Sequence, residues 1–99
     1  MLQLGNKFTK KDWAILKNNI QGFRGELHHT AGKQYEYLNL LLPLSVHEHR
    51  GNGHAKNYHQ PDLVPKELRD RALSLWKTWL PEEDFNYFVE NGLIYDYQV

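Results

Sequence analysis

The chain has 99 residues, the length of one domain, which excludes an enzyme with a separate cofactor domain. It contains no cysteine, which excludes disulfides, thiolate zinc sites and a cysteine nucleophile. Its longest apolar run, residues 40–44, is far shorter than the roughly 20 residues that a membrane span needs. The N-terminus does not have the charged and then apolar pattern of a secretory leader, so we expect a cytoplasmic protein without a membrane partner.

The net charge is zero, but the charges are unevenly distributed along the chain. Residues 1–60 carry eight basic and four acidic residues, and residues 61–99 carry four basic and eight acidic residues. A neutral total therefore does not exclude a phosphate-binding face in the first part of the chain. The alternative is an ordinary surface on which both signs of charge are mixed.

The first predicted element is a short helix that begins after Thr9. Thr9 and Asp12 have the spacing of a capping box, with Asp12 in place of the usual glutamate. Gly22 is expected to close this helix, because glycine tolerates the positive φ of a helix C-terminus. Apolar residues follow the cap at helical spacing: Trp13, Leu16 and Ile20.

Short extended segments follow the first helix. Residues 25–29 are predicted to form a strand that enters a loop at residues 30–32. Residues 38–42 are predicted to form a second strand that Pro43 stops. A further capping-box spacing predicts a helical turn that begins near Val46.

The C-terminal part is predicted to be a pair of helices. Pro65 suits the first turn of one helix, Pro81 separates it from the next, and Gly92 follows the end of the second. Residues 93–95 form either a closing strand or a packed tail. The apolar faces of these helices are expected to be core rather than a base-stacking surface: Leu68, Ala72, Leu75, Trp76 and Trp79, then Phe85, Phe88 and Val89.

All six histidines lie in one window of the chain: His28, His29, His47, His49, His54 and His59. Histidine is the commonest protein ligand of metals and the usual acid or base near neutral pH. In a chain without cysteine, such a window favours a metal ion that is bound through imidazoles.

The order of these residues is more specific than their number. The chain reads Glu26-Leu27-His28-His29, then Asn39-Leu40-Leu41-Leu42-Pro43-Leu44, then His49 and His54. Over residues 23–59 it resembles the HNH endonucleases of the ββα-metal superfamily, and most of all their small, cysteine-free phage-type members. The resemblance implies a ββα-metal hairpin and helix, one divalent metal ion (Mg, Mn, Zn or Ni), and action on nucleic acid inside a host cell.

The resemblance also implies a role for each matching residue. His28, His49 and His54 would be the metal ligands, His29 the general base, and Asn39 the residue that holds the base loop or orients the imidazole. Neighbouring residues of a strand point to opposite faces, so His28 and His29 are not expected to do the same work. Three basic residues near the motif are expected to bind phosphate: Lys33, Arg50 and Lys56.

The chain departs from the family pattern between the last two ligands. Four residues separate His49 from His54 where the family has three. A regular helix would turn these two residues about 140° apart, too far for one ion, so the chain must leave the helix before His54. His47 could replace His49 if the helical turn begins later, and His59 is a reserve ligand.

We therefore expect an α+β fold with a ββα-metal hairpin among short flanking helices. Residues 1–99 form one domain, with the site in residues 23–59 and a helical scaffold in residues 61–92. The predicted function is metal-dependent hydrolysis of nucleic-acid phosphodiester bonds, above all those of DNA. The alternative is a non-catalytic, metal-stabilised module that binds nucleic acid or protein, or a regulatory partner protein that uses its acidic C-terminal helices. The small size also suggests a homodimer or a larger protein partner.

Overall fold

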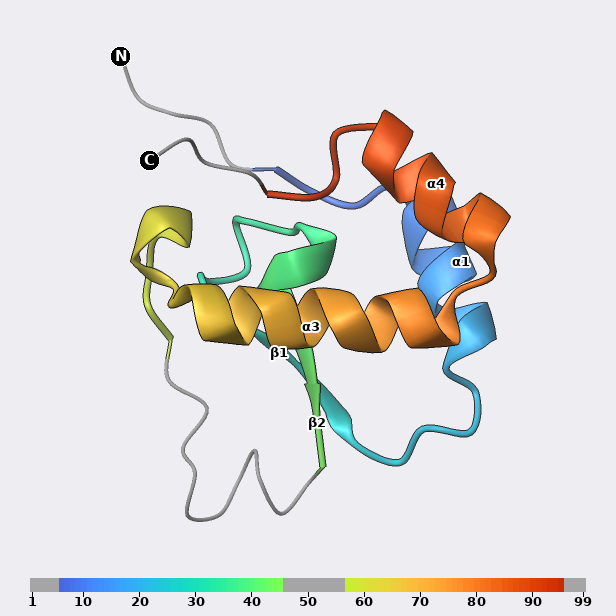
Figure 1. The fold of residues 1–99 in the computed structure, drawn as a ribbon, viewed down its shortest axis with the longest axis horizontal. Helices are drawn as coiled ribbons and strands as arrows, with labels where there is room; N and C mark the ends of the chain where they lie inside the picture. Colours follow the sequence, from blue (N-terminus) through green and yellow to red (C-terminus); the bar gives the residue numbers. More distant parts are fainter. Residues whose placement is uncertain (1–5, 46–56, 96–99) are drawn as a thin grey trace.

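The computed structural model describes residues 6–45 and 57–95. In chain order these residues form α1 (Lys10–Asn19), β1 (Glu26–His29), the 3₁₀ turn η1 (Leu38–Leu40), β2 (Leu41–Leu44), the 3₁₀ turn η2 (Pro61–Leu63), α3 (Lys66–Trp79) and α4 (Glu82–Glu90). The fold is a small α+β arrangement in which the two-stranded sheet packs against α3 (Figure 1), so the predicted class is confirmed at this level. The helical turn predicted near Val46 lies outside the described residues.

The capping box predicted at the start of α1 is formed. Thr9 Oγ1 accepts the Asp12 N–H at 3.1 Å, and Asp12 Oδ2 accepts the Thr9 N–H at 2.8 Å. The predicted end of the helix is wrong: α1 ends at Asn19, and the Ile20 N–H bonds the Lys17 carbonyl. Gly22 is not among the residues with positive φ. A tightened last turn closes this helix, so no left-handed glycine is needed.

The strands pair antiparallel, with Glu26 opposite Leu44 and His29 opposite Leu41. The first strand begins one residue later than predicted. The second strand is present, but its bounds were predicted wrongly: residues 38–40 form η1, and β2 continues through Pro43. The Thr30 N–H donates to the Leu40 carbonyl, and hydrogen-bonded pairs alternate along an antiparallel ladder. Pro43 therefore occupies a non-bonded pair, where its nitrogen faces away from β1 and no hydrogen bond is lost.

The helix α3 covers the sheet and supplies its main anchor. Trp76 is fully buried and its Nε1–H donates to the Leu41 carbonyl at 2.7 Å, a group that the ladder leaves free. Trp79 is partly buried against the same core, so the expectation that both tryptophans pack in the core is confirmed. The buried members of this core come from both the early and the late part of the described chain: Phe8, Leu16, Leu38, Leu41, Trp76, Leu80, Phe88 and Leu93.

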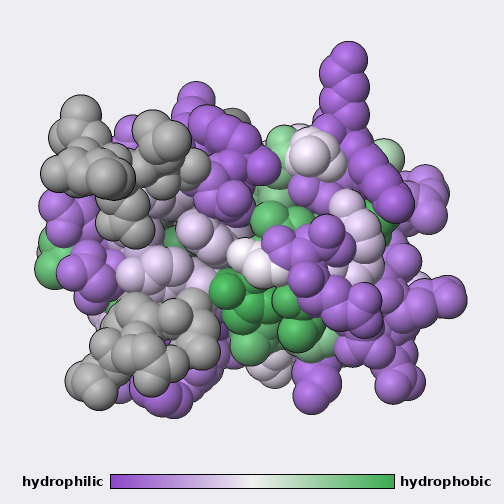
Figure 2. Space-filling view, turned by 90° about the horizontal axis from the view of Figure 1, so that it is seen from above, coloured by the Kyte–Doolittle hydropathy of each residue, from purple (hydrophilic) through white to green (hydrophobic). Residues whose placement is uncertain are grey.

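The C-terminal segment closes the molecule. The helix α4 lies beside α1 (Figure 1) and ends as predicted, with Gly92 at a φ of 69°. Residues 93–95 form a packed tail, whose Leu93 carbonyl accepts the Leu38 N–H at 2.7 Å. None of the helices within residues 6–45 and 57–95 is long and apolar enough to cross a membrane. Seen from above, the surface is largely hydrophilic around a central apolar patch (Figure 2).

Candidate functional site

The two neighbouring histidines of β1 lie on opposite faces of the sheet. His28 is opposite Leu42, which packs against Ala72 of α3. His29 is opposite Leu41, which belongs to the main core, and its ring lies 6.4 Å from that of Trp13 on α1. Strand pairing thus separates the two imidazoles, as the alternation of side chains along a strand predicts.

His29 is held by a carboxylate that the sequence motif did not identify. The Nε2 atom of His29 lies 3.0 Å from Glu36 Oε2, and Glu36 is only 8% exposed. The other oxygen, Oε1, accepts the Phe8 N–H at 2.9 Å. In the neutral ring, a carboxylate that accepts the Nε2–H favours the tautomer with the proton on Nε2, in which Nδ1 is the nitrogen that can accept a proton. The sequence offered one weak indication of this role, because Glu36 is the one acidic residue between Glu26 and Glu48.

A pocket of about 210 Å³ opens beside this pair. The described residues that line it are Leu27, His28, His29, Gly32, Lys33 and Asn57. Asn57 reaches the pocket because the Tyr58 N–H bonds the Thr30 carbonyl at 2.7 Å, which brings residues 57–58 beside the end of β1. The cavity runs along β1, so His28 and His29 both line it although their side chains alternate between the two faces, and Lys33 lines it as well.

Asn39 is engaged elsewhere. Its amide oxygen accepts the Tyr95 N–H at 2.8 Å, and its amide nitrogen donates to the Tyr95 carbonyl at 2.7 Å. Asn39 is buried, at 4% exposure. In the described structure its side chain tethers the C-terminal tail, whereas the side-chain partner of His29 is Glu36.

The predicted metal site is described only in part. Residues 46–56 lie outside the described residues, and they include the predicted ligands His49 and His54, the phosphate-binding Arg50 and Lys56, and the alternative ligand His47. Within residues 6–45 and 57–95, no three His, Asp or Glu side chains lie close enough to hold an ion. Of the expected ligands His28, His49 and His54, His28 alone lies in this part, so the described donors alone do not fit a metal ion.

The reserve ligand His59 is exposed and has a backbone of positive φ, at 67°. Its N–H donates to Asn57 Oδ1 at 2.8 Å, an arrangement in which the asparagine side chain stabilises a turn. A histidine in this conformation carries about 1 kcal/mol of backbone strain. His59 thus stands in a tight turn that follows the Asn57 edge of the pocket.

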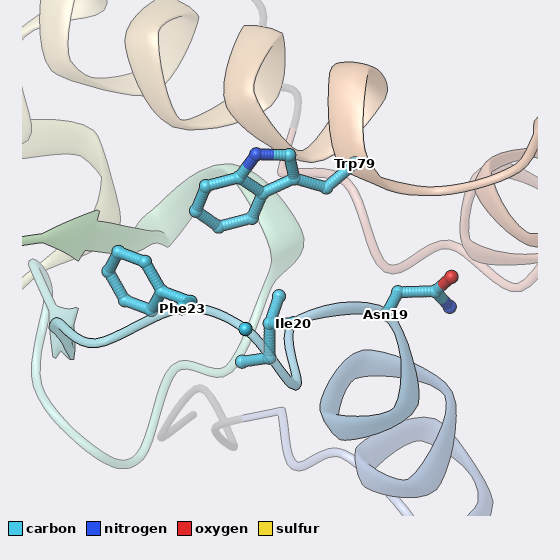
Figure 3. A pocket seen from close by; sticks show the side chains of 5 residues that line it. Asn19, Ile20, Phe23 and Trp79 are labelled. Carbon is cyan, nitrogen blue, oxygen red and sulfur yellow. The ribbon is translucent and has the colours of Figure 1, made fainter.

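A second cavity, of about 360 Å³, lies between the C-terminal ends of α1 and α3. Figure 3 shows Ile20, Phe23 and Trp79 gathered around it, with the Asn19 amide pointing away. The rings of Phe23 and Trp79 are 5.1 Å apart. The described residues that line this cavity include no titratable side chain. The His29 pocket, which has titratable side chains, is therefore the better candidate for acid–base catalysis.

Comparison of the chain with protein-family models, with curated proteins and with solved structures finds no match in any of the three.

Proposed function

We propose that this protein is a metal-dependent endonuclease that hydrolyses phosphodiester bonds of nucleic acid, with DNA as its substrate. The observation that carries the proposal is the His29–Glu36 pair, at 3.0 Å, beside a pocket that also contains Lys33. A buried carboxylate behind an imidazole is the arrangement that sets its tautomer and orientation for general-base catalysis. The antiparallel hairpin of β1 and β2 supports the proposal, because a ββα-metal site would be built on such a hairpin.

Each residue of the pocket has a task in this proposal. His29 accepts a proton from the attacking water at Nδ1, and Glu36 holds the ring through Nε2. Lys33 is exposed and binds a phosphate oxygen of the substrate. His28, on the other face of the strand, would bind the metal together with His49 and His54, and the metal would supply positive charge for the phosphoryl group.

The test is a nicking assay on supercoiled plasmid DNA with Mg, Mn, Zn or Ni. We expect cleavage with at least one metal, and a loss of about 10²–10⁴-fold in rate for His29→Ala. Calorimetry of the same variant should show metal binding close to that of the parent. His28→Ala should lose both cleavage and metal binding.

Two outcomes would contradict the proposal or its assignment of roles. A protein that binds metal, unfolds when the metal is chelated and cuts no nucleic acid would be a non-catalytic, metal-stabilised module. Equal loss of metal binding in the two histidine variants would show that His28 and His29 are both ligands. Lys33→Ala should also slow cleavage, because its contact with the phosphate is lost. Lys77→Ala, an exposed change on α3, is its matched control in the same assay.

A further inference from the structure

One side of α1 combines two lysines with an aromatic ring. Lys10, Trp13, Ala14 and Lys17 are spaced three and four residues apart, which places them on one side of the helix. They are the described residues that line a cavity of about 560 Å³. Lys10, Ala14 and Lys17 are exposed and Trp13 is half-buried. We call Lys10, Trp13 and Lys17 the α1 track.

The other side of α1 faces α4. The acidic side chain of α1 is buried on that side, where it is hydrogen-bonded to α4. Asp12, the one acidic residue of α1, is 2% exposed and bonds the Tyr87 hydroxyl at 2.7 Å. Asn19 bonds Asp84 Oδ2 at 3.3 Å on the same side. The α1 track therefore presents positive charge without an acidic neighbour from its own helix.

Trp13 joins the α1 track to the candidate active site. Its ring stands edge-on to Phe8, at 5.2 Å and 87°, and lies 6.4 Å from the ring of His29. The Lys17 ammonium lies over the indole at 5.9 Å from the ring centroid. Phe8 thus packs against the indole, and Trp13 and Lys17 both line the cavity on this side of α1, where a stacked base would take the place of the Lys17 ammonium.

The positive charge continues from the α1 track to the His29 pocket. Lys7 precedes α1 and its ammonium bonds the Lys33 carbonyl, so Lys7 lies beside the pocket that Lys33 lines. Among the described residues, the carboxylate next to His29 is Glu36, which is buried. A polyanion could therefore follow lysines from Lys17 to Lys33 and pass His29 on its way.

We propose that the α1 track binds a single-stranded segment of nucleic acid, with one unpaired base stacked on Trp13 and phosphates on Lys10 and Lys17. The two lysines are seven residues apart, about 10 Å along the helix, which is the span of about three phosphates of a stacked strand. A base can reach an indole face only when it is unpaired, because duplex bases are covered by their neighbours. The inference deepens the proposed nuclease function and rests on it for the role of this strand as substrate.

The test is binding of a fluorescein-labelled oligothymidylate, measured by anisotropy across a salt series in EDTA, where no metal-dependent cleavage can occur. Trp13→Leu should weaken binding about tenfold, because a stacked base is lost. Trp13→Phe should keep most of the affinity. Lys10→Gln with Lys17→Gln should reduce the slope of log affinity against log salt by about 1.4.

The matched control is Lys11→Gln with Lys77→Gln, which removes the same charge outside the α1 track. Lys11 faces the Tyr87 ring, at 4.8 Å, and Lys77 is exposed on α3. Equal slopes for the two double variants, or a parent protein that prefers a duplex of the same length, would overturn the inference. Tight binding by the parent that depends on the α1 track, without cleavage in the plasmid assay, would remove the nuclease proposal and leave this surface intact.

Discussion

At the scale of single residues, Glu36 decides what His29 can do. Glu36 is buried, and each of its oxygens has a defined partner, the Phe8 N–H and the His29 ring. A carboxylate has no proton to give, so the histidine must supply the hydrogen of that bond. In the neutral ring the proton is then on Nε2, and Nδ1 is the nitrogen that suits a general base.

Replacement of Glu36 by glutamine should reverse this tautomer. The introduced amide would keep the Phe8 hydrogen bond through its oxygen and donate to His29 Nε2 through its nitrogen, which places the ring proton on Nδ1. We expect Glu36→Gln to lower the nicking rate at least about tenfold, within the range of general-base loss. Nitrogen-15 chemical shifts of the His29 ring should report the changed tautomer, which a merely destabilised protein would not show.

At the scale of elements, the start of α1 is fixed by the Thr9–Asp12 capping box, in which both reciprocal hydrogen bonds are present. Thr9→Ala removes the acceptor for the Asp12 N–H and should lower the free energy of unfolding by about 1 kcal/mol, measured by urea denaturation. Thr78→Ala on α3 is the matched control. The Thr78 hydroxyl bonds the Ser74 carbonyl within its own helix, so that change should have an effect of less than about 0.5 kcal/mol.

The start of β1 depends on a glycine for its close approach to β2. A Cβ at Gly25 would lie 2.0 Å from the Leu44 carbonyl oxygen and 2.2 Å from the Phe23 ring. Gly25→Ala should therefore force the strands apart and lower the free energy of unfolding by about 1–3 kcal/mol. Nothing lies within 4 Å of a Cβ at Gly22, so Gly22→Ala should be neutral or slightly stabilising. Equal thermal shifts in these two variants would contradict the close packing at Gly25.

At the scale of the whole molecule, a contact between α1 and α4 joins the early and the late part of the described structure. Tyr87 donates its hydroxyl hydrogen to Asp12 Oδ1 at 2.7 Å. This hydrogen bond, together with partial burial and the negative charge of Asp12, raises the pKa of Tyr87 above its ordinary value of 10.0. The hydrogen bond between Tyr87 and Asp12 therefore joins two helices that are far apart in the sequence, and it depends on the hydroxyl keeping its proton.

The raised pKa makes this contact sensitive to alkali. The folded protein holds the Tyr87 proton more tightly than the unfolded chain, so the stabilisation is complete below pH 10 and is lost as the pH rises above it. Tyr87→Phe should unfold more easily than the parent at neutral pH, and the gap between the two should shrink above about pH 10. Urea denaturation at a series of pH values measures the gap, and a constant gap would contradict the prediction.

Much of the helical structure could be predicted because its signals are local. The capping box at Thr9 and Asp12, the proline before each C-terminal helix and the glycine after α4 act within one helical turn of the residues they affect. The β1 strand could be predicted for a similar reason, because the loop signal at residues 30–32 directly follows it in the sequence. The histidine doublet predicted a site at the end of that strand, and a cavity lined by both histidines lies there.

Other features depended on contacts between distant residues. Pro43 fits inside β2 because the register with β1 places it in a pair that needs no N–H. The residues next to Pro43 in the sequence do not determine that register. Asn39 bonds Tyr95, and Glu36 meets both His29 and Phe8. Local patterns of polarity and spacing specify helices, caps and candidate ligands, whereas the choice of which buried polar groups satisfy one another is made when the chain packs. A buried polar group needs a hydrogen-bond partner, and the tertiary structure determines which residue provides it.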